Sequence, residues 1–452
     1  MPGRELIDAR IGDGSVDTVV VAFPDVYGRP VGKRVTADFF ASHVAAHGIE
    51  ACEYLLAVDI DMTPLPGYTF ASWDTGYGDV VCRPDYSTAR LIPWLPGTAM
   101  VIADLTDEEG EPVEVSPRQI LRRQLARAAE RGLRVNCATE LEFFLFRDSY
   151  EEATAKGWKG LTPHTSTIED YQLLQTTREE YILRRIRNEM IGADIPVEFS
   201  KGEAGRGQHE VNVTYDEALV TADRHLVFKN GIKEIAAQEG RAATFMAKWT
   251  MDDVGSSCHV HASLWDAESG EALMADPSHP SGLSVVGQRF LAGQLHSARE
   301  LAWCAAPTVN SYRRYIPGSW APTAIVWGED NRTCGFRVVG QGEGRRVESR
   351  IPGADVNPYL ALAATIAAGL YGIDHELALG DPYPRNAYEA TDVPRVPSTL
   401  VEAIAELRGS GVADEAFGPD VHHHLLNTAV QEWEACNRHV SDWELARNFE
   451  RI

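Results

Sequence analysis

Four short segments of the chain alternate apolar residues with ionisable or polar ones, and this period of two constrains the fold more strongly than any other feature. In an extended strand successive side chains point to opposite faces, so residues i and i+2 share a face and lie about 6.6–6.8 Å apart. Each segment therefore predicts a strand with one apolar and one polar face. The four polar faces carry Glu140 and Glu142; Glu210 and Asn212; His259, His261 and Ser263; and Arg346, Glu348 and Arg350.

The side chains on these polar faces have matching chemistry. A half-exposed strand often turns such a face to water, and that alternative stays open for any one segment taken alone. Taken together, carboxylates and imidazoles suit hard divalent cations such as Mg²⁺ or Mn²⁺. Cys258 alternates away from His259, which argues against a cysteine–histidine zinc site. The neighbouring arginines suit the clamping of carboxylate or phosphate groups, so the combination predicts metal-assisted phosphoryl transfer.

An acidic, turn-rich stretch at residues 104–117 marks the best candidate for a domain boundary. It ends in Ser116, a suitable N-cap, and in Pro117, which predicts the first position of a helix that stops near Gly132. Before the stretch, residues 18–23 and 31–35 predict strands of a small α+β module. After it, strands and helices alternate, with a long alanine-rich helix at 358–372 and further helices over the last fifty residues.

Composition excludes several classes of partner. The 42 basic and 66 acidic residues give a formal net charge of −24, whereas nucleic acids and anionic membranes require a basic face. An acidic surface suits cationic ligands or metal ions, with solubility as the alternative reading. The sequence has no apolar run near the roughly 18 residues of a membrane helix and no secretory signal. Seven cysteines without regular spacing predict a reducing cytoplasm rather than a disulfide framework.

Two further motifs give weaker signals. The glycine-rich residues 202–207 match neither a P-loop nor a Rossmann fingerprint, so they imply no dinucleotide fold. The run His422-His423-His424 resembles a metal-binding tract. It lies outside the four strands in a polar, helix-like segment, and we therefore predict a solvated face there.

Beyond these patterns, the chain resembles the bacterial type I glutamine synthetase family across nearly its whole length. Residues 203–210, for example, read Glu-Ala-Gly-Arg-Gly-Gln-His-Glu, and residues 255–263 read Gly-Ser-Ser-Cys-His-Val-His-Ala-Ser. The order and spacing of the matching motifs make the resemblance highly specific. These motifs are residues 28–34, 140–143, 203–210, 255–263, 310–318, 331–332 with 337, and 346–352.

The resemblance implies an α+β glutamine synthetase fold, with an N-terminal β-grasp domain over residues 1–108 and a catalytic α/β domain over residues 109–452. It further implies an active-site funnel at a subunit interface, a homo-dodecamer of two stacked hexameric rings, ATP as co-substrate, and two or three Mg²⁺ or Mn²⁺ ions per site. Glu142, Glu203 and Glu210 would hold one metal, and Glu140, His259 and Glu348 the other. ATP would contact Glu198, Tyr215, His261, Ser263, Arg337 and Arg346. Glutamate would contact Gly255, Arg314, Arg332 and Arg350.

The chain departs from the family pattern in the half of the site that would take the amine. The family's flap loop carries a Glu that helps to form the ammonium pocket, whereas residues 317–322 read Pro-Gly-Ser-Trp-Ala-Pro and place Trp320 there. The family's Asp-Gly-Ser-Ser signature is missing from residues 65–74, and Trp249 and Val254 replace a Pro and an Asn of the family. An ammonium ion needs a compact carboxylate cage, whereas an indole offers an apolar wall and a cation–π face. On this ground we assign a catalytic role to Trp320, and the resemblance implies catalytic roles for Arg332 and Arg337.

The resulting hypothesis is a glutamate–amine ligase that acts through γ-glutamyl phosphate on a polyamine or a small monoamine such as ethanolamine, in amine catabolism or detoxification. One alternative is a true glutamine synthetase in which Trp320 only packs in the flap. Another is a catalytically silent relative, although all six predicted metal ligands are present. Asp74 and Asp79 are the nearest acidic candidates for deprotonating the amine. Tyr388 resembles a tyrosine that is adenylylated in some members, with a packed aromatic as the alternative.

Overall fold

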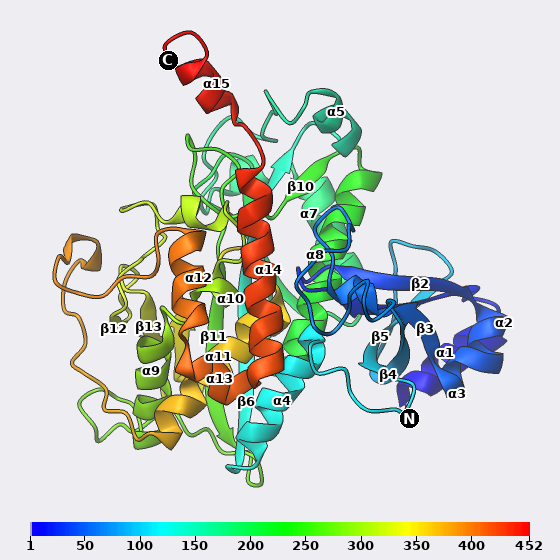
Figure 1. The fold of residues 1–452 in the computed structure, drawn as a ribbon, viewed down its shortest axis with the longest axis horizontal. Coiled ribbons are helices and arrows are strands. Elements are labelled where there is room, and N and C mark those ends of the chain that lie inside the picture. The colour runs from blue at the N-terminus through cyan, green and yellow to red at the C-terminus, as the bar shows by residue number, and fades with distance from the viewer. Residues whose placement is uncertain (1) are drawn as a thin grey trace.

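The computed structural model describes residues 2–452 and contains two β-sheets, of which the smaller lies near the N-terminus (Figure 1). Its five strands have the order β2-β1-β5-β4-β3, in which β1 pairs parallel with β5 and the other pairs are antiparallel. The predicted strands at 18–23 and 31–35 are confirmed as β1 and β2. The strand bounds are β1 Thr18–Pro24, β2 Pro30–Thr36, β3 Ile49–Cys52, β4 Asp79–Leu91 and β5 Thr98–Thr106.

The larger sheet contains nine strands, and the four predicted polar strands are neighbours within it. Its order is β12-β13-β14-β11-β6-β8-β7, while β9 and β10 both pair with β6. The predicted strands are confirmed as β6, β8, β11 and β14, so their polar faces adjoin. The bounds are β6 Leu133–Phe146, β7 Val197–Gly202, β8 Gln208–Val213, β9 Asp216–Glu217, β10 Ala242–Thr244, β11 Cys258–Asp266, β12 Trp327–Glu329, β13 Phe336–Val339 and β14 Arg346–Ser349.

Helices surround both sheets, and the two helices predicted in detail are confirmed. The first begins at Pro117 after Ser116, whose side chain makes no capping hydrogen bond, and the second begins at Pro358. None of the helices within residues 2–452 combines the length and apolar character needed to cross a bilayer. The bounds are α1 Pro2–Gly12, α2 Ala37–Phe39, α3 Ala45–His47, α4 Pro117–Ala129, α5 Tyr150–Ala155, α6 Leu173–Thr176, α7 Glu180–Gly192, α8 Ala218–Gln238, α9 Val285–Ser297, α10 Ala302–Ala305, α11 Pro358–Asp374, α12 Leu400–Arg408, α13 Gly411–Phe417, α14 Pro419–Asn437 and α15 Asp442–Asn448.

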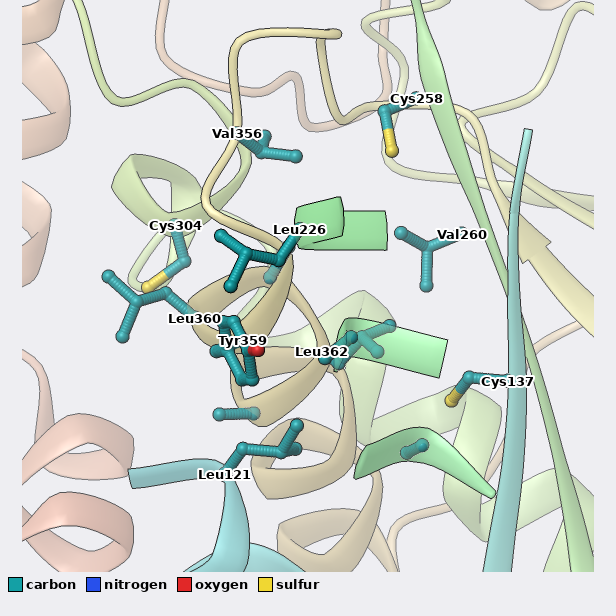
Figure 2. Packing of buried hydrophobic residues seen from close by; sticks show 14 of the residues in the cluster. Leu121, Cys137, Leu226, Cys258, Val260, Cys304, Val356, Tyr359, Leu360 and Leu362 are labelled. Atoms are coloured by element: carbon teal, nitrogen blue, oxygen red, sulfur yellow. The ribbon is translucent and has the colours of Figure 1, made fainter. Parts of the chain in front are cut away.

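The main hydrophobic core lies around α11, which is buried along most of its length. Figure 2 shows Leu360 and Leu362 of α11 among Leu121 of α4, Leu226 of α8 and Val260 of β11. Each fully buried side chain of this size contributes about 1.5–3 kcal/mol of hydrophobic stabilisation. The apolar faces of the polar strands are thus committed to the core, and their other faces remain for the site.

A buried ionic cluster joins the smaller sheet to helices α4 and α8, both of which contact β6 of the larger sheet. Arg118 of α4, which is 1 % exposed, donates to Asp85 of β4 at 2.7 Å and to Asp223 of α8 at 2.8 Å. It also pairs with Asp104 of β5 at 2.5 Å, and the hydroxyl of Tyr359 donates to Asp223 at 2.6 Å.

The domain boundary predicted at residue 108 falls in the loop between β5 and α4, and the division into two domains stays a prediction.

The structure shows that the prediction of a solvated histidine run was wrong. His422 and His424 are 7 % and 2 % exposed, and only His423 faces solvent. Nδ1 of His422 lies 2.5 Å from a carboxylate oxygen of Asp414, while the ring of His424 lies 4.6 Å from that of Tyr68. Helix α14 is covered on two sides, by α12 and α13 and by the segment around residue 68, so two of the three imidazoles are enclosed.

The C-terminal residues 438–452, which we call the C-terminal arm, project from the body of the molecule (Figure 1). The arm contains α15 and carries apolar side chains that contact little of the rest of the chain. The exposed side chains, between 47 % and 98 % accessible, are Val440, Trp443, Leu445, Phe449 and Ile452.

Candidate active site

The strand register brings the predicted site residues together on one side of the larger sheet. The β11–β6 pairing places His259 opposite Glu140, and the β6–β8 pairing places Glu142 opposite Glu210. Directly opposite residues of antiparallel strands have Cβ atoms about 4.5–5.5 Å apart, so these side chains converge. The chemical roles assigned to them remain predictions.

Glu142, Glu203 and Glu210 form a buried cluster whose ligand atoms lie within 4.8 Å of one another. One oxygen of Glu142 accepts hydrogen bonds from the backbone N–H of Ser257 at 2.7 Å and from the amide of Gln208 at 3.1 Å. Burial and then repulsion from Glu203 raise the pKa of Glu142 to about 8. Burial and repulsion from neighbouring carboxylates likewise raise the pKa of Glu203 and that of Glu210 to about 7. An all-oxygen set with this excess of negative charge fits Mg²⁺ or Mn²⁺, as predicted for the first metal.

Lys201 of β7 also belongs to this cluster, and the sequence reading missed it. Its ammonium group pairs with Glu203 and lies 4.6 Å from the centre of the Tyr171 ring. The β7–β8 register places Lys201 opposite Glu210. The i, i+2 rule applied from Glu203 back to Lys201 would have found it, because both side chains extend to the same face.

A second cluster surrounds Glu140. Oxygens of Glu140 lie 3.2 Å from Nδ1 of His259 and 2.9 Å from Nε2 of His261. The atoms that approach within 4.8 Å of one another belong to Glu140, His261 and Glu348, whereas the predicted metal set contains His259. Nδ1 of His259 is 3.7 Å from Glu348, and its buried Nε2 has no hydrogen-bond partner within the described residues. The structure therefore brings both imidazoles to this site, and the choice of His259 as the ligand stays a prediction.

The protonation of the second cluster follows from burial and from its neighbours. Burial opposes ionisation of Glu140, but hydrogen bonds from His259 and His261 outweigh it and hold the pKa of Glu140 below its usual value. Burial, followed by the positive charge of Arg350, lowers the pKa of His259 to about 4. His259 is therefore neutral at physiological pH, the form in which an imidazole binds a metal.

Three of the predicted arginines contact the second cluster, and a fourth, Arg314, borders the first. Arg337 of β13 donates to Glu348 at 2.8 Å, Arg350 also pairs with Glu348, and Nε of Arg346 approaches Nδ1 of His261 at 3.1 Å. Arg314, which is 1 % exposed, donates to the Ser257 hydroxyl at 3.1 Å. Guanidinium groups that border carboxylates in this way are placed to neutralise a substrate carboxylate or a phosphoryl group.

Two adjoining cavities open on this face of the sheet. The first, of about 500 Å³, is lined by five of the six residues predicted for ATP, namely Glu198, Tyr215, His261, Ser263 and Arg346. The sixth, Arg337, lines the second cavity, of about 540 Å³. The wall of the second cavity also contains Trp320, the first carboxylate cluster and His259. All four residues predicted to bind glutamate line this cavity as well, namely Gly255, Arg314, Arg332 and Arg350.

Trp320 lies on the flap loop and is 57 % exposed. Its φ angle is 61°, in the left-handed region that costs a non-glycine residue about 1–2 kcal/mol.

Asp74 and Asp79, the acidic candidates from the sequence, line neither cavity. The hydroxyl of Tyr388 is buried without a hydrogen-bond partner in the described chain, so the packed aromatic is the arrangement that the structure has.

The chain is similar over nearly its whole length to several known enzymes. A family profile described as "Glutamine synthetase, catalytic domain" matches residues 114–448. A gamma-glutamylethanolamide synthetase from Streptomyces coelicolor is 52 % identical over 450 residues, covering 100 % of this chain and 96 % of that protein. A glutamate–isopropylamine ligase from a Pseudomonas species is 39 % identical, covering 97 % of this chain and 96 % of that protein. The solved structure of a GmaS/ADP complex superposes with a TM-score of 0.86 at 28 % identity, covering 98 % of this chain and 99 % of that one.

Proposed function

The chain belongs to the glutamine synthetase family, and from this premise we propose that it joins the γ-carboxylate of glutamate to an organic amine, with ATP as co-substrate. It has the glutamine synthetase fold and is a carbon–nitrogen ligase of the glutamate–amine type. The observation that carries the choice of an organic amine is Trp320, an indole in the wall of the cavity that also contains the predicted glutamate arginines.

The two cavities suit the two halves of this reaction. ATP would bind in the first cavity and glutamate in the second, with the carboxylate clusters between them. The γ-carboxylate of glutamate attacks the γ-phosphorus of ATP, which forms γ-glutamyl phosphate and releases ADP. The amine, after losing the proton of its ammonium form, then attacks the γ-carbonyl carbon with its nitrogen lone pair, phosphate leaves with the electron pair of the C–O bond, and the nitrogen gives up a second proton to become the amide.

The protein supplies orientation and charge neutralisation for both steps. Glu142, Glu203 and Glu210 would hold one divalent ion and Glu140, His259 and Glu348 another, and such ions neutralise charge on the transferred phosphoryl group. Arg332 and Arg337, both in the wall of the second cavity, would stabilise the same developing charge through hydrogen bonds. The buried Arg314 and Arg350 would hold the carboxylates of glutamate in place.

A small monoamine such as ethanolamine is the substrate that we favour. Trp320, Tyr171 and Phe199 give the second cavity an aromatic wall beside its charged wall. Aromatic rings attract an organic ammonium group through cation–π contacts and shield its carbon atoms from water. The 52 % identity with a protein named gamma-glutamylethanolamide synthetase supports ethanolamine ahead of a polyamine.

We extend the proposal to assembly and location. The exposed apolar side chains of the C-terminal arm would be buried in a homo-dodecamer of two stacked rings, since exposed apolar groups gathered in this way mark contact sites. All seven cysteines are free thiols, which suits a reducing cytoplasm.

Phosphate release from ATP tests the proposed function directly. The protein would be supplied with Mg²⁺ and glutamate and then with ammonium, ethanolamine, isopropylamine, putrescine or spermidine in turn. We expect turnover with ethanolamine that exceeds turnover with ammonium. Turnover chiefly with ammonium would make the protein a true glutamine synthetase, turnover chiefly with putrescine or spermidine would move the preference to polyamines, and no turnover with any nucleophile would favour a silent relative.

A further inference from the structure

Asp170 is a carboxylate in the wall of the second cavity to which the sequence reading assigned no role. The other carboxylates lining this cavity, within residues 2–452, are Glu140, Glu142, Glu203 and Glu210, all of which belong to the predicted metal sets. Asp170 is exposed and makes no side-chain hydrogen bond or ion pair with any described residue. It is therefore a negative charge in the substrate cavity without a partner from the chain itself.

The backbone that carries Asp170 is fixed against the end of β7. The next residue, Tyr171, donates its N–H to the carbonyl of Gly202 at 3.4 Å. A Cβ atom on Gly202 would come within 2.7 Å of Cβ of Glu169, so only glycine allows this approach. Because Gly202 directly precedes the predicted metal ligand Glu203, Asp170 is held close to the part of the cavity where the chemistry would occur.

The preceding residue, Glu169, belongs to a fully buried cluster of ionisable side chains. Glu169, Glu179 and His209 are all 0 % exposed, and their ligand atoms lie within 4.8 Å of one another. Nε2 of His209 is 2.5 Å from Glu179, whose other oxygen is 2.6 Å from Nδ1 of His164. Glu169 is thus enclosed in the interior, while the next residue, Asp170, lines the cavity.

We propose that Asp170 binds the ammonium group of the incoming amine. This inference rests on the proposed function, and it names the group that recognises the amine. An alkylamine is a cation at neutral pH and needs a carboxylate that no metal ion occupies. Asp170 meets this requirement, and it lines the same cavity as the aromatic wall of Trp320, Tyr171 and Phe199, on which the carbon atoms of the amine would pack.

The test replaces Asp170 by Asn, which keeps the shape and removes the charge, and by Glu, which keeps the charge. A matched control is Asp381→Asn, because Asp381 is also exposed and unpaired in the described chain but lies outside the cavity. We expect Asp170→Asn to raise KM for ethanolamine at least about tenfold, the effect of losing one hydrogen bond to a charged group. KM for ATP and KM for glutamate should be unchanged, and Asp170→Glu should restore part of the lost affinity.

Hydroxylamine gives a second readout because it is largely uncharged at neutral pH. Asp170→Asn should form γ-glutamyl hydroxamate from glutamate, ATP and hydroxylamine as fast as the unaltered protein does. Equal KM values for ethanolamine in Asp170→Asn and Asp381→Asn would overturn the assignment, and so would an equal loss of the ethanolamine and hydroxylamine reactions. If the unaltered protein used no organic amine, the proposed function itself would fail, and that outcome is distinct from either of these.

Discussion

Replacing Arg118 by Met should loosen the contact of the smaller sheet with helices α4 and α8. The guanidinium of Arg118 donates to Asp85, Asp104 and Asp223 while its side chain is 1 % exposed. After the substitution, Asp85 and Asp104 would keep their bonds to Arg122. Asp223, which is 4 % exposed, would keep only the hydroxyl of Tyr359, so a charge would remain buried and almost unpaired.

The magnitude follows from that uncompensated charge. Removing one member of a buried ion pair destabilises a protein by about 3–5 kcal/mol. Arg122→Met is the matched control, because Arg122 lies on the same helix, pairs with two of the same aspartates and is 35 % exposed. A partly exposed pair contributes only about 0–1 kcal/mol. We therefore expect the two substitutions to differ by at least about 2 kcal/mol.

Hydrogen exchange followed by mass spectrometry can measure this difference locally. Amides of α4 and β5 that exchange when the smaller sheet separates from α4 should exchange about two to nearly four orders of magnitude faster in Arg118→Met. Adding Asp223→Asn to Arg118→Met should slow the exchange again, since it removes the stranded charge. Equal exchange rates in Arg118→Met and Arg122→Met, or faster exchange in the double variant, would refute the reasoning.

Three further predictions concern the site and its support. Trp320→Glu should raise turnover with ammonium and weaken turnover with larger amines, and an unchanged amine preference would remove Trp320 from the account of specificity. Burial lowers the pKa of His424 from 6.5 to about 4, so the folded protein resists protonation there; stability should be unaffected above about pH 6.5 and fall by up to about 3 kcal/mol as the pH drops towards 4. His424→Phe should remove that part of the pH dependence of the free energy of unfolding, measured with urea. Identical pH profiles of the variant and the unaltered protein would contradict the assignment to His424. Glu203→Gln should abolish most of the rise in melting temperature that Mg²⁺ produces, which a thermal shift assay with and without EDTA would measure, whereas an undiminished rise would remove Glu203 from the metal set.

The face of the strand on which each side chain lies could be predicted from the sequence, because a period of two is a local property. Glu140, Glu142, Glu210, His259 and Glu348 could be assigned to polar faces without any knowledge of which strands pair. The order β14-β11-β6-β8 and its register were not accessible, because they depend on contacts between segments far apart in the chain. The family resemblance grouped the residues into metal, ATP and glutamate sets but gave neither the strand order nor the register.

Residues outside the motifs were missed for related reasons. Asp170 lies in an irregular segment, where no periodicity indicates the direction of a side chain. His424 was assigned to solvent because its neighbours on α14 are polar, but the contact that encloses it comes from Tyr68, more than 350 residues earlier. Local polarity therefore gave a wrong prediction where a distant segment covered the helix.

Most of the predicted metal ligands lie on strands, whereas the residues proposed to contact the amine lie on connecting segments, and this difference affects how such a protein can evolve. Five of the six predicted metal ligands, all except Glu203, occupy cross-strand positions, where the loss of one residue would reverse the face of every later side chain in that strand. Asp170 and Trp320 lie on connecting segments, which accept insertions and substitutions far more readily. If Asp170 and Trp320 select the amine as proposed, descendants of such a chain can exchange one amine for another by altering these two loops, while the residues on the strands are retained.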